Sequence, residues 1–359
     1  MTNQLRDKPD KLKTKPTLEE LEDWTFNVFD NLESNNHYAI HYSGGKDSSA
    51  LLGLYLKWLD SKAIAALPNI SVIFNDTLLE SKKLYQLIDD MGKVLADKNI
   101  EFNITRPAID RTYWAVQFGI GYPVPNHKNR WCTGELKVNP SKKFYKQREG
   151  AIPITGTHLG ESHKRNQRLS RCGSTECGID KIKEKVNTIN PVAKWDNCDV
   201  WDWLIINSDE YLYKGFFDQL ESAYTDTTSE KSDGSLRMGC AFCPVVAIKT
   251  LENNVSNGVS KPYVVEIRKI LEKLRKAPRI NSPKTGNKGA IKVEYRKIYW
   301  GQIERYFSQL KEDGFIDDEI IAYVDKKLAS DSYPPTYPKE WIKEQEELLE
   351  SQYKQLSLF

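Results

Sequence analysis

The spacing of apolar residues along the first part of the chain predicts strands that alternate with helices. Short apolar runs typical of buried strands occur at 38–42, 70–74, 102–105 and 151–155. Helical stretches occur between them at 49–59 and 80–98. Because strands that alternate with helices are joined by crossover connections, this order predicts an α/β fold in which a parallel sheet is flanked by helices.

The hydrophobic pattern changes after about residue 224. Residues 225–239 are rich in Ser, Thr, Asp and Gly and predict a loop that precedes a mostly helical C-terminal portion. Its predicted helices are 262–276, 293–312, 317–329 and 338–354. Near the other end, Thr17 and Glu20 predict a capping box that begins a helix ending near Leu32. The expected parts are an N-terminal arm and helix (1–35), an α/β domain (36–224) and a C-terminal domain (225–359).

The composition fits a folded chain and excludes wholesale disorder. Of the 359 residues, 39% are hydrophobic and 28% are charged, which provides material for a core and a solvated surface. The longest apolar run is far shorter than the roughly 18 residues that a membrane span needs, and the N-terminal residues lack the apolar stretch of an export signal. We therefore expect a cytoplasmic protein with no membrane partner, whose six cysteines are reduced.

The formal net charge of +2 conceals two regions of opposite charge. Residues 261–298 contain 12 Lys or Arg and 3 Asp or Glu, whereas residues 299–359 contain 7 Lys or Arg and 13 Asp or Glu. The basic stretch adjoins Tyr295, Tyr299 and Trp300, a combination that suits the phosphate backbone of a nucleic acid, although a solvated helix face has the same composition. The acidic tail predicts an amphipathic helix that docks on this basic stretch or on a partner.

The run with the strongest chemical content follows the first predicted strand: Ser43-Gly44-Gly45-Lys46-Asp47-Ser48-Ser49. The two glycines allow a tight turn that brings backbone N–H groups onto an anion, and the helix N-terminus behind them adds partial positive charge. Lys46 supplies a positive charge for phosphate, Asp47 suits Mg²⁺, and the serine hydroxyls can donate hydrogen bonds. The run therefore predicts a site for the phosphates of a nucleotide.

This run resembles the PP-loop of the ATP pyrophosphatase superfamily, whose members cleave ATP between its α- and β-phosphates and adenylate a substrate oxygen. Phosphoadenosine-phosphosulfate (PAPS) reductases share that fold. Residues 75–80 are similar to the acidic turn of PAPS-reductase-like chains. The resemblance implies ATP and Mg²⁺ as cofactors, with phosphates bound by residues 43–49. It also implies that Asp76 holds Mg²⁺ or a ribose hydroxyl, although Asp is common in such turns for structural reasons.

Four further segments resemble the sulfurtransferases of DNA phosphorothioation, namely the C component of the Dnd system and the D component of the Ssp system. They are 119–137, which contains Arg130-Trp131-Cys132-Thr133, then 156–165, 190–201 and 237–243. The resemblance implies that Gly156 and Glu161 belong to a nucleotide-binding turn, and that Arg165 clamps phosphate. The residues implied to act in catalysis are Lys46, Asp47, Asp76 and Arg165.

Five of the six cysteines are candidate metal ligands. They are the CxxC pair Cys240 and Cys243, the pair Cys172 and Cys177, and the single Cys132. In the resembled family a [4Fe–4S] cluster is bound by the counterparts of Cys132 and the CxxC pair and by a fourth cysteine shortly before that pair. Because residues 222–239 contain no cysteine, Cys172 or Cys177 would have to be the fourth ligand. A zinc site made from the two pairs, and thiols that carry sulfur as a persulfide, are the alternatives.

Together these motifs predict an ATP pyrophosphatase and sulfurtransferase of DNA phosphorothioate modification. We expect it to adenylate a phosphate of the DNA backbone, which then receives sulfur delivered by a cysteine desulfurase, within a complex that contains further subunits. A PAPS or adenylylsulfate reductase, a tRNA-thiolating enzyme and a non-catalytic nucleotide-binding subunit are the alternatives. The first of these requires a reactive cysteine near a mobile C-terminus, and no cysteine follows Cys243.

Overall fold

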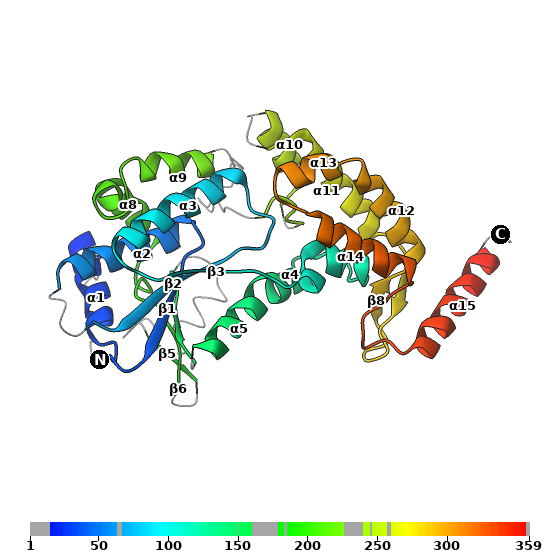
Figure 1. Cartoon of the computed structure of the whole chain (residues 1–359), viewed down its shortest axis with the longest axis horizontal. Helices are drawn as coiled ribbons and strands as arrows, with labels where there is room; N and C mark the ends of the chain where they lie inside the picture. Colours follow the sequence, from blue (N-terminus) through cyan, green and yellow to red (C-terminus); the bar gives the residue numbers. More distant parts are fainter. Residues whose placement is uncertain are drawn as a thin grey trace, which may run out of the picture.

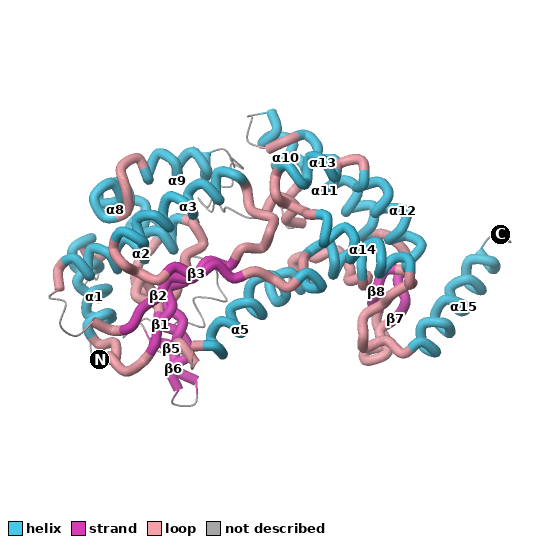
Figure 2. Tube along the Cα trace, viewed as in Figure 1, coloured by secondary structure: helices cyan, strands magenta, loops and turns pink. Residues whose placement is uncertain are grey.

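The computed structural model of the chain has two lobes joined by a helical segment (Figure 1). It describes residues 15–62, 67–148, 150–159, 179–182, 185–225, 240–244, 246–256 and 260–356. The first lobe contains a six-stranded sheet with its helices, and the second lobe is mostly helical (Figure 2). No helix within the described ranges is long and apolar enough to cross a membrane.

The sheet of the first lobe confirms the predicted α/β fold. Its strand order is β3-β2-β1-β4-β6-β5, in which β5 is antiparallel to its neighbour and the other strands are parallel. The strands are β1 (His37–His41), β2 (Asn69–Asn75), β3 (Phe102–Thr105), β4 (Ile152–Ile154), β5 (Ile179–Ile182) and β6 (Lys185–Ile189). The first four match predicted strands. The sequence pattern does not predict β5 and β6, because charged residues interrupt their apolar positions.

Helices cover both faces of this sheet. Successive residues of each strand point to opposite sides, so that one strand contributes to the cores on both faces. On one face, Tyr38 and Ile40 of β1 belong to the main hydrophobic core. The helices that contribute to this core are α1 (Leu18–Asp30), α2 (Lys46–Asp60), α3 (Lys82–Asp97), α8 (Asn197–Tyr211) and α9 (Phe216–Thr225). On the opposite face, Ala39 and Ile73 pack with Phe144 of α5 (Asn139–Gln147). This arrangement leaves the carboxyl ends of the strands open to loops, which is where α/β sheets bind ligands.

The second lobe has its own hydrophobic core. Its elements are α10 (Ile248–Ser256), α11 (Pro262–Arg275), β7 (Arg279–Asn281), β8 (Lys288–Ile291), α12 (Val293–Glu304), α13 (Phe307–Glu312), α14 (Asp318–Ala329) and α15 (Lys339–Leu356). Aromatic rings fill this core: the ring centroids of Phe118 and Trp300 are 5.1 Å apart, and those of Trp114 and Phe242 are 5.3 Å apart. Trp114 and Phe118 come from the segment between β3 and α5. That segment therefore packs with the C-terminal elements, although it precedes them by more than a hundred residues.

Arg296 of α12 binds the segment between β3 and α5 to the second lobe through hydrogen bonds. Its buried guanidinium donates hydrogen bonds to the carbonyl oxygens of Phe118 (2.9 Å), Gly119 (2.9 Å), Ile291 (3.1 Å) and Ser332 (2.7 Å). Burial lowers the pKa of Arg296 to about 10, so that the side chain stays charged at neutral pH. The sequence places Arg296 in the basic stretch suited to nucleic acid, whereas in the structure this cation is an internal support.

We expect Arg296→Gln to destabilise the protein, because the shorter amide cannot reach all of the carbonyls and leaves buried acceptors without donors. The free energy of unfolding, measured by urea denaturation, should fall by roughly 3 kcal/mol. The control is Lys297→Gln, which removes an exposed charge whose Nζ lies 2.8 Å from Asp331. That change should cost less than about 1 kcal/mol. Equal losses in the two variants would contradict the supporting role of Arg296.

Candidate functional site

The loop at residues 43–49 joins the carboxyl end of β1 to the N-terminus of α2. Gly44 has φ +71°, and a Cβ on it would lie 2.2 Å from Leu84 Cδ1, so both the backbone conformation and the space require glycine. The loop is closed by Ser48, whose hydroxyl lies 3.0 Å from Ser43 Oγ and donates to the carbonyl of Gly45 at 2.9 Å. The helix begins at Lys46, three residues before the predicted start. Its N-terminal dipole therefore points into the loop.

A buried cluster of charges lies directly behind this loop. Lys46 is only 5% exposed; its ammonium group donates to the carboxylate of Asp47 and to Asn197 Oδ1, the latter at 2.8 Å. The same oxygen of Asp47, Oδ1, lies 3.0 Å from Nε2 of the fully buried His158. In addition, the backbone N–H of Lys46 donates to the hydroxyl of Tyr224 at 2.9 Å. Residues from α2, the loop after β4, α8 and α9 therefore meet at the start of α2.

Both ring nitrogens of His158 have a partner. Nδ1 lies 2.6 Å from the carbonyl oxygen of Leu159, and Nε2 faces the Asp47 carboxylate. The ring therefore links the loop after β4 to the first turn of α2. Although burial acts to raise the pKa of Asp47, the hydrogen bond from His158 and the charge of Lys46 hold that pKa below its ordinary value. Lys46 and His158 therefore both hold the Asp47 carboxylate in place at the start of α2.

Gly156 holds the loop after β4 against the loop at 43–49. A Cβ on Gly156 would lie 2.7 Å from the carbonyl oxygen of Asp47 and 3.2 Å from the backbone nitrogen of Ser48. Both of these atoms belong to the backbone and cannot move aside cheaply. The predicted site residue Gly156 is thus in direct contact with the loop. Glu161 and Arg165, predicted for the same turn, lie outside the described residues.

We expect Gly156→Ala to weaken nucleotide binding, because the added methyl group forces the loop after β4 away from the N-terminus of α2. ATP affinity, measured by calorimetry, should fall at least 10-fold, together with a lower melting temperature. The control is Gly301→Ala within α12, where a Cβ meets nothing within 4 Å. That variant should keep ATP affinity and be as stable as the parent or slightly more so. An unchanged ATP affinity in Gly156→Ala would contradict this placement of the site.

The turn after β2 engages both oxygens of Asp76 in hydrogen bonds. Oδ1 accepts from the backbone N–H of Leu78 (2.8 Å) and from the hydroxyl of Tyr85 (2.6 Å), and Oδ2 accepts from Nε of Arg106 (2.8 Å). Asp76 is 1% exposed. These contacts stabilise a turn in which Leu78 has φ +62°. The contacts of Asp76 show that it stabilises the turn. A role of Asp76 in holding Mg²⁺ stays a prediction.

Three of the predicted cysteine ligands come together near this turn. The backbone N–H of Ala241 donates to the carbonyl of Leu79 at 2.8 Å, which attaches the CxxC turn to the segment after β2. Cys240 and Cys243 are linked by a side-chain hydrogen bond, and Cys243 is close enough to Cys132 to influence its ionisation. All three are partly buried. Cys172 and Cys177, the candidates for a fourth ligand, lie outside the described residues, and Cys198 is exposed on α8.

The surroundings of these cysteines favour the protonated thiol. Its hydrogen bond with Cys243, together with burial, raises the pKa of Cys240 well above the ordinary value. Burial, and then the charge of Cys243, raises the pKa of Cys132. The hydroxyl of Tyr113, whose ionisation is affected by all three cysteines, is buried without a hydrogen-bond partner among the described residues. The environment therefore contains a buried donor close to the sulfurs.

The three cysteines have the chemistry to bind a metal ion or an iron–sulfur cluster, although their side chains are not arranged as a metal site. Among the residues that the structure describes, no three His, Cys, Asp or Glu side chains are placed so that they could hold a metal ion. Three convergent thiols with a spare buried donor have the chemistry of an iron–sulfur or zinc site, which binds thiolates and releases their protons. Residues Leu79–Leu84 connect this cysteine group with the loop at 43–49, since Leu79 contacts Ala241 and Leu84 lies against Gly44.

Sequence reasoning missed three residues of the site: His158, Asn197 and Tyr224. They approach Lys46 and Asp47 from positions more than a hundred residues away along the chain. The sequence assigns no functional role to His158, because no second histidine has metal-ligand spacing to it. Its place two residues after Gly156, in a turn that follows a strand, is the signal that points to it. Ser49, predicted to contact the cofactor, is fully buried, whereas Ser43 is exposed.

The fold defines an α/β protein whose glycine-rich loop at residues 43–49 lies at the carboxyl edge of a parallel sheet. Residues 37–245, more than half of the chain, match the phosphoadenosine phosphosulfate reductase domain, and the chain belongs to that family.

Two curated relatives are uncharacterized proteins of Methanocaldococcus jannaschii. One is 27% identical over 237 residues, which make up 65% of this chain and 48% of that protein. The other is 26% identical over 211 residues, which make up 58% of this chain and 36% of that protein. The chain therefore spans less than half of the length of these relatives.

Similar solved structures include the PAPS reductase of Candida auris in a phosphate complex, with 17% identity, a TM-score of 0.35, and coverage of 56% of this chain and 92% of that one. The U34-tRNA thiolase of Methanococcus maripaludis with its [4Fe-4S] cluster is 14% identical, with a TM-score of 0.38 and coverage of 78% and 86%. The NMN synthetase of Francisella tularensis is 15% identical, with a TM-score of 0.31 and coverage of 70% and 89%.

Proposed function

We propose that the protein is an ATP pyrophosphatase that adenylates a phosphate of the DNA backbone and then replaces the activated oxygen with sulfur. The observation that carries this proposal is the connection of two groups in one family member: a glycine-rich loop at a helix N-terminus, suited to phosphates, and three convergent cysteines, joined by Leu79–Leu84. The DNA phosphate, the cysteine desulfurase that supplies sulfur, and further subunits of a phosphorothioation complex are parts of the same proposal.

The first step is the cleavage of ATP at the loop. A non-bridging oxygen of the DNA phosphate attacks the α-phosphorus of ATP, the bond from that phosphorus to the α–β bridging oxygen breaks, and pyrophosphate leaves. Backbone N–H groups at the start of α2 and the hydroxyl of Ser43 bind the phosphates, and the buried charge of Lys46 offsets the charge that develops on pyrophosphate. The chain mainly positions the reactants and neutralises charge.

Asp47 is the residue that we expect to hold Mg²⁺. Lys46 and His158 both donate to its Oδ1, while Oδ2 accepts no hydrogen bond from a described residue. The Asp47 side chain is 27% exposed, so that part of it is open to solvent. When bound, Mg²⁺ neutralises phosphate oxygens and orients the leaving group. His158 fixes the orientation of the carboxylate.

The second step replaces oxygen by sulfur. A dithiol reductant releases sulfide from the persulfide that the desulfurase delivers and is itself oxidised to a disulfide. The sulfide attacks the DNA phosphorus, and AMP leaves with the oxygen that came from DNA. Cys132, Cys240 and Cys243, with Cys172 or Cys177 as a fourth ligand, would hold a [4Fe–4S] cluster, which can bind sulfur near the acceptor. A zinc site made by Cys172, Cys177, Cys240 and Cys243 is the alternative, and it does not require Cys132.

PAPS reduction is the second candidate, since the family takes its name from that activity. It requires a thiolate that attacks sulfur, whereas burial raises the pKa of Cys132 and the hydrogen bond with Cys243 raises that of Cys240. These shifts disfavour a free nucleophilic thiolate. Sulfite released from PAPS in the presence of a dithiol would identify this second activity.

We expect the protein to convert ATP to AMP and pyrophosphate in the presence of DNA and Mg²⁺. Lys46→Gln should lower the rate at least 100-fold, because it removes the buried cation at the start of the loop's helix. The control is Lys93→Gln on α3, whose side chain is 72% exposed and lies away from the loop. Pyrophosphate and phosphate are measured separately by enzyme-coupled assays. Release of phosphate with ADP, or an unaffected rate in Lys46→Gln, would contradict the proposal.

We expect anaerobically purified protein to contain iron and acid-labile sulfide, with absorbance near 400 nm. Cys132→Ser should lose the iron, and Cys198→Ser, which changes the exposed cysteine on α8, should retain it. A colourless protein that holds zinc in both variants would exclude the cluster and support the zinc alternative.

We expect Tyr113→Phe to lower the reduction potential of the cluster without loss of iron, because the variant lacks the buried hydroxyl that can donate to the cluster. An unchanged reduction potential would show that this hydroxyl does not donate to it.

A further inference from the structure

We propose that the phosphate backbone of double-stranded DNA docks on a basic face that begins at the cysteine group and follows α5. This face, here called the α5 face, is formed by Lys128, Arg130, Lys137, Lys142, Lys143 and Lys146. The inference rests on the proposed function, because it identifies where the nucleic-acid substrate lies. It assigns DNA to a part of the chain other than the basic stretch at 261–298.

The α5 face is exposed and almost unopposed by acidic groups. All six side chains are exposed, and none forms an ion pair with a residue in the described ranges. The single acid between 128 and 146 is Glu135, which is partly buried, lies 3.7 Å from Arg111 and accepts a hydrogen bond from Asn139. Six such cations within nineteen residues create a strong positive potential. Such a potential favours a polyanion.

The packing of α5 explains why these lysines face solvent. Pro140, Ser141 and Phe144 form the buried side of the helix, and Phe144 packs on the sheet. Lys142 and Lys146 therefore project from the opposite side and are one turn apart, about 6 Å along the helix axis. Two successive phosphate steps of a DNA strand span a similar axial distance, about 7 Å. The spacing lets adjacent lysines contact phosphates of one strand.

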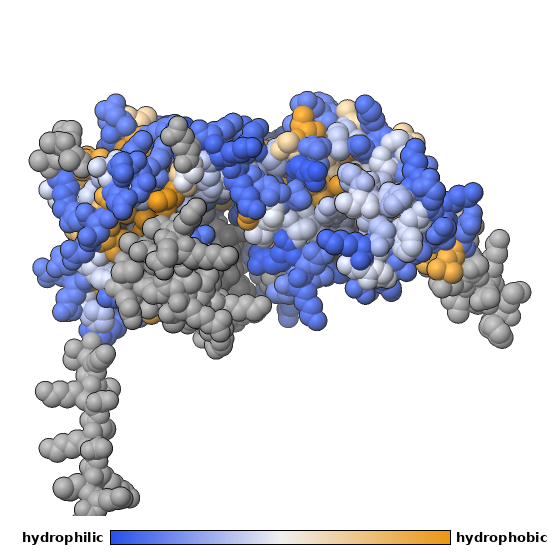
Figure 3. Space-filling model, turned by 90° about the horizontal axis from the view of Figure 1, so that it is seen from below, coloured by the Kyte–Doolittle hydropathy of each residue, from blue (hydrophilic) through white to orange (hydrophobic). Residues whose placement is uncertain are grey.

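The position of the α5 face connects it to the proposed chemistry. Arg130 acts on the ionisation of Cys132, and Lys137 acts on that of Cys240, so both cations are near the cysteine group. From there the face follows α5, which bridges the two lobes in Figure 1. Seen from below, hydrophilic residues cover much of the described surface where the lobes meet (Figure 3). A DNA strand on this face would pass the cysteines that supply sulfur.

The basic stretch at 261–298 is less suited to DNA than its composition indicates. Arg268, Lys292 and Arg296 are buried. Other members are paired with acids: Lys261 with Asp313, Lys269 with Glu252 and Glu266, Arg275 with Glu272, and Lys297 with Asp331. The acidic helix α15 packs beside β7, where Trp341 Nε1 donates to the carbonyl of Asn281 at 2.9 Å. Its carboxylates reduce the positive potential of the β7–β8 hairpin.

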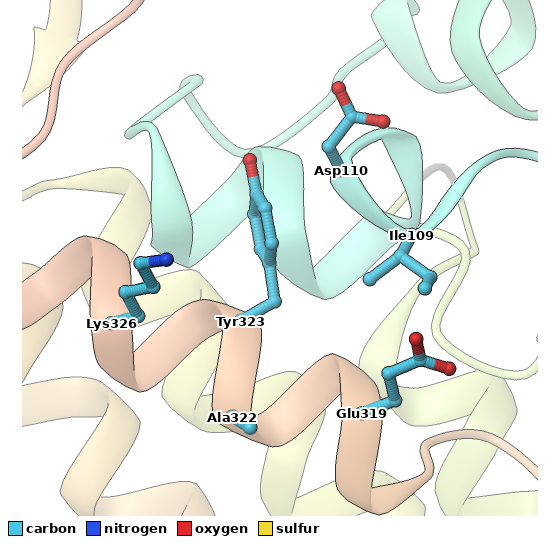
Figure 4. A pocket seen from close by; sticks show the side chains of 6 residues that line it. All are labelled: Ile109, Asp110, Glu319, Ala322, Tyr323 and Lys326. Carbon is cyan, nitrogen blue, oxygen red and sulfur yellow. The ribbon is translucent and has the colours of Figure 1, made fainter.

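A groove of about 480 Å³ between η2 (Ile109–Arg111) and α14 is also unsuited to phosphates (Figure 4). Asp110 and Glu319 line it together with Tyr323 and Lys326. Two carboxylates against one lysine repel a polyanion. Among these surfaces, the α5 face has the charge that DNA requires.

The test measures the binding of a fluorescent DNA duplex by anisotropy at several salt concentrations. The variant Lys142→Gln/Lys143→Gln/Lys146→Gln should lose affinity at least 10-fold and reduce the slope of log K against log salt by about 1 for each DNA phosphate that the variant no longer neutralises. The matched control, Lys273→Gln/Lys284→Gln/Lys288→Gln, removes three exposed lysines of the other basic stretch. It should keep nearly all of the affinity and the slope. Arg130→Gln/Lys137→Gln provides a second variant outside α5 if the triple variant unfolds.

Several outcomes would overturn the inference. They are equal losses in the α5 variant and its control, a loss confined to the control, no affinity of the parent protein for DNA, and binding of RNA but not of DNA. Pyrophosphate release from ATP, measured separately, distinguishes a failure of the proposed ATP chemistry from a failure of the proposed DNA surface. A protein that cleaves ATP to AMP yet binds DNA independently of the α5 face retains the ATP chemistry and loses only this surface.

Discussion

The burial of Lys46 at the start of α2 is the constraint on which the rest of the site depends. A buried ammonium group without partners costs several kcal/mol, so the fold must bring oxygen acceptors to it. Asp47 and Asn197 supply them, and His158 contacts the same carboxylate. Because these partners come from α2, α8 and the loop after β4, one charge fixes three elements around the loop. The N-terminus of α2 points into the loop where a phosphate is expected.

The two chemical groups of the protein are connected by a short segment after β2. Leu79 is hydrogen-bonded to the CxxC turn, and Leu84 fills the space beside Gly44. Asp76 stabilises the turn that precedes this segment through three hydrogen bonds. The same short segment therefore contacts both the loop at 43–49 and the cysteine group. In the proposed reaction this connection brings ATP cleavage and sulfur transfer to neighbouring places, while the α5 face leads DNA toward both.

Local pattern predicts the parallel sheet well, because β1 to β4 are apolar runs bounded by polar turns. The glycines at 44 and 45 likewise predict the tight turn in which Gly44 has φ +71°. Long-range contacts are beyond such reasoning. His158, Asn197 and Tyr224 are unremarkable in their local sequence and become important only when the fold brings them to Lys46. Charge counting is misleading for the same reason: Arg268 and Arg296 count as surface cations by composition, yet both are buried. The approach of Cys132 to the CxxC pair is expected from resemblance rather than from spacing.

The central claim is that an oxygen of DNA becomes bonded to the α-phosphorus of ATP. It can be followed with DNA whose non-bridging phosphate oxygens carry oxygen-18, incubated with the protein, ATP, Mg²⁺ and sulfide. Mass spectrometry of the AMP released then reports where the heavy oxygen goes. We predict AMP that contains oxygen-18 from DNA and a backbone phosphate that contains sulfur. Unlabelled AMP together with DNA that retains all of its oxygen-18 would contradict it.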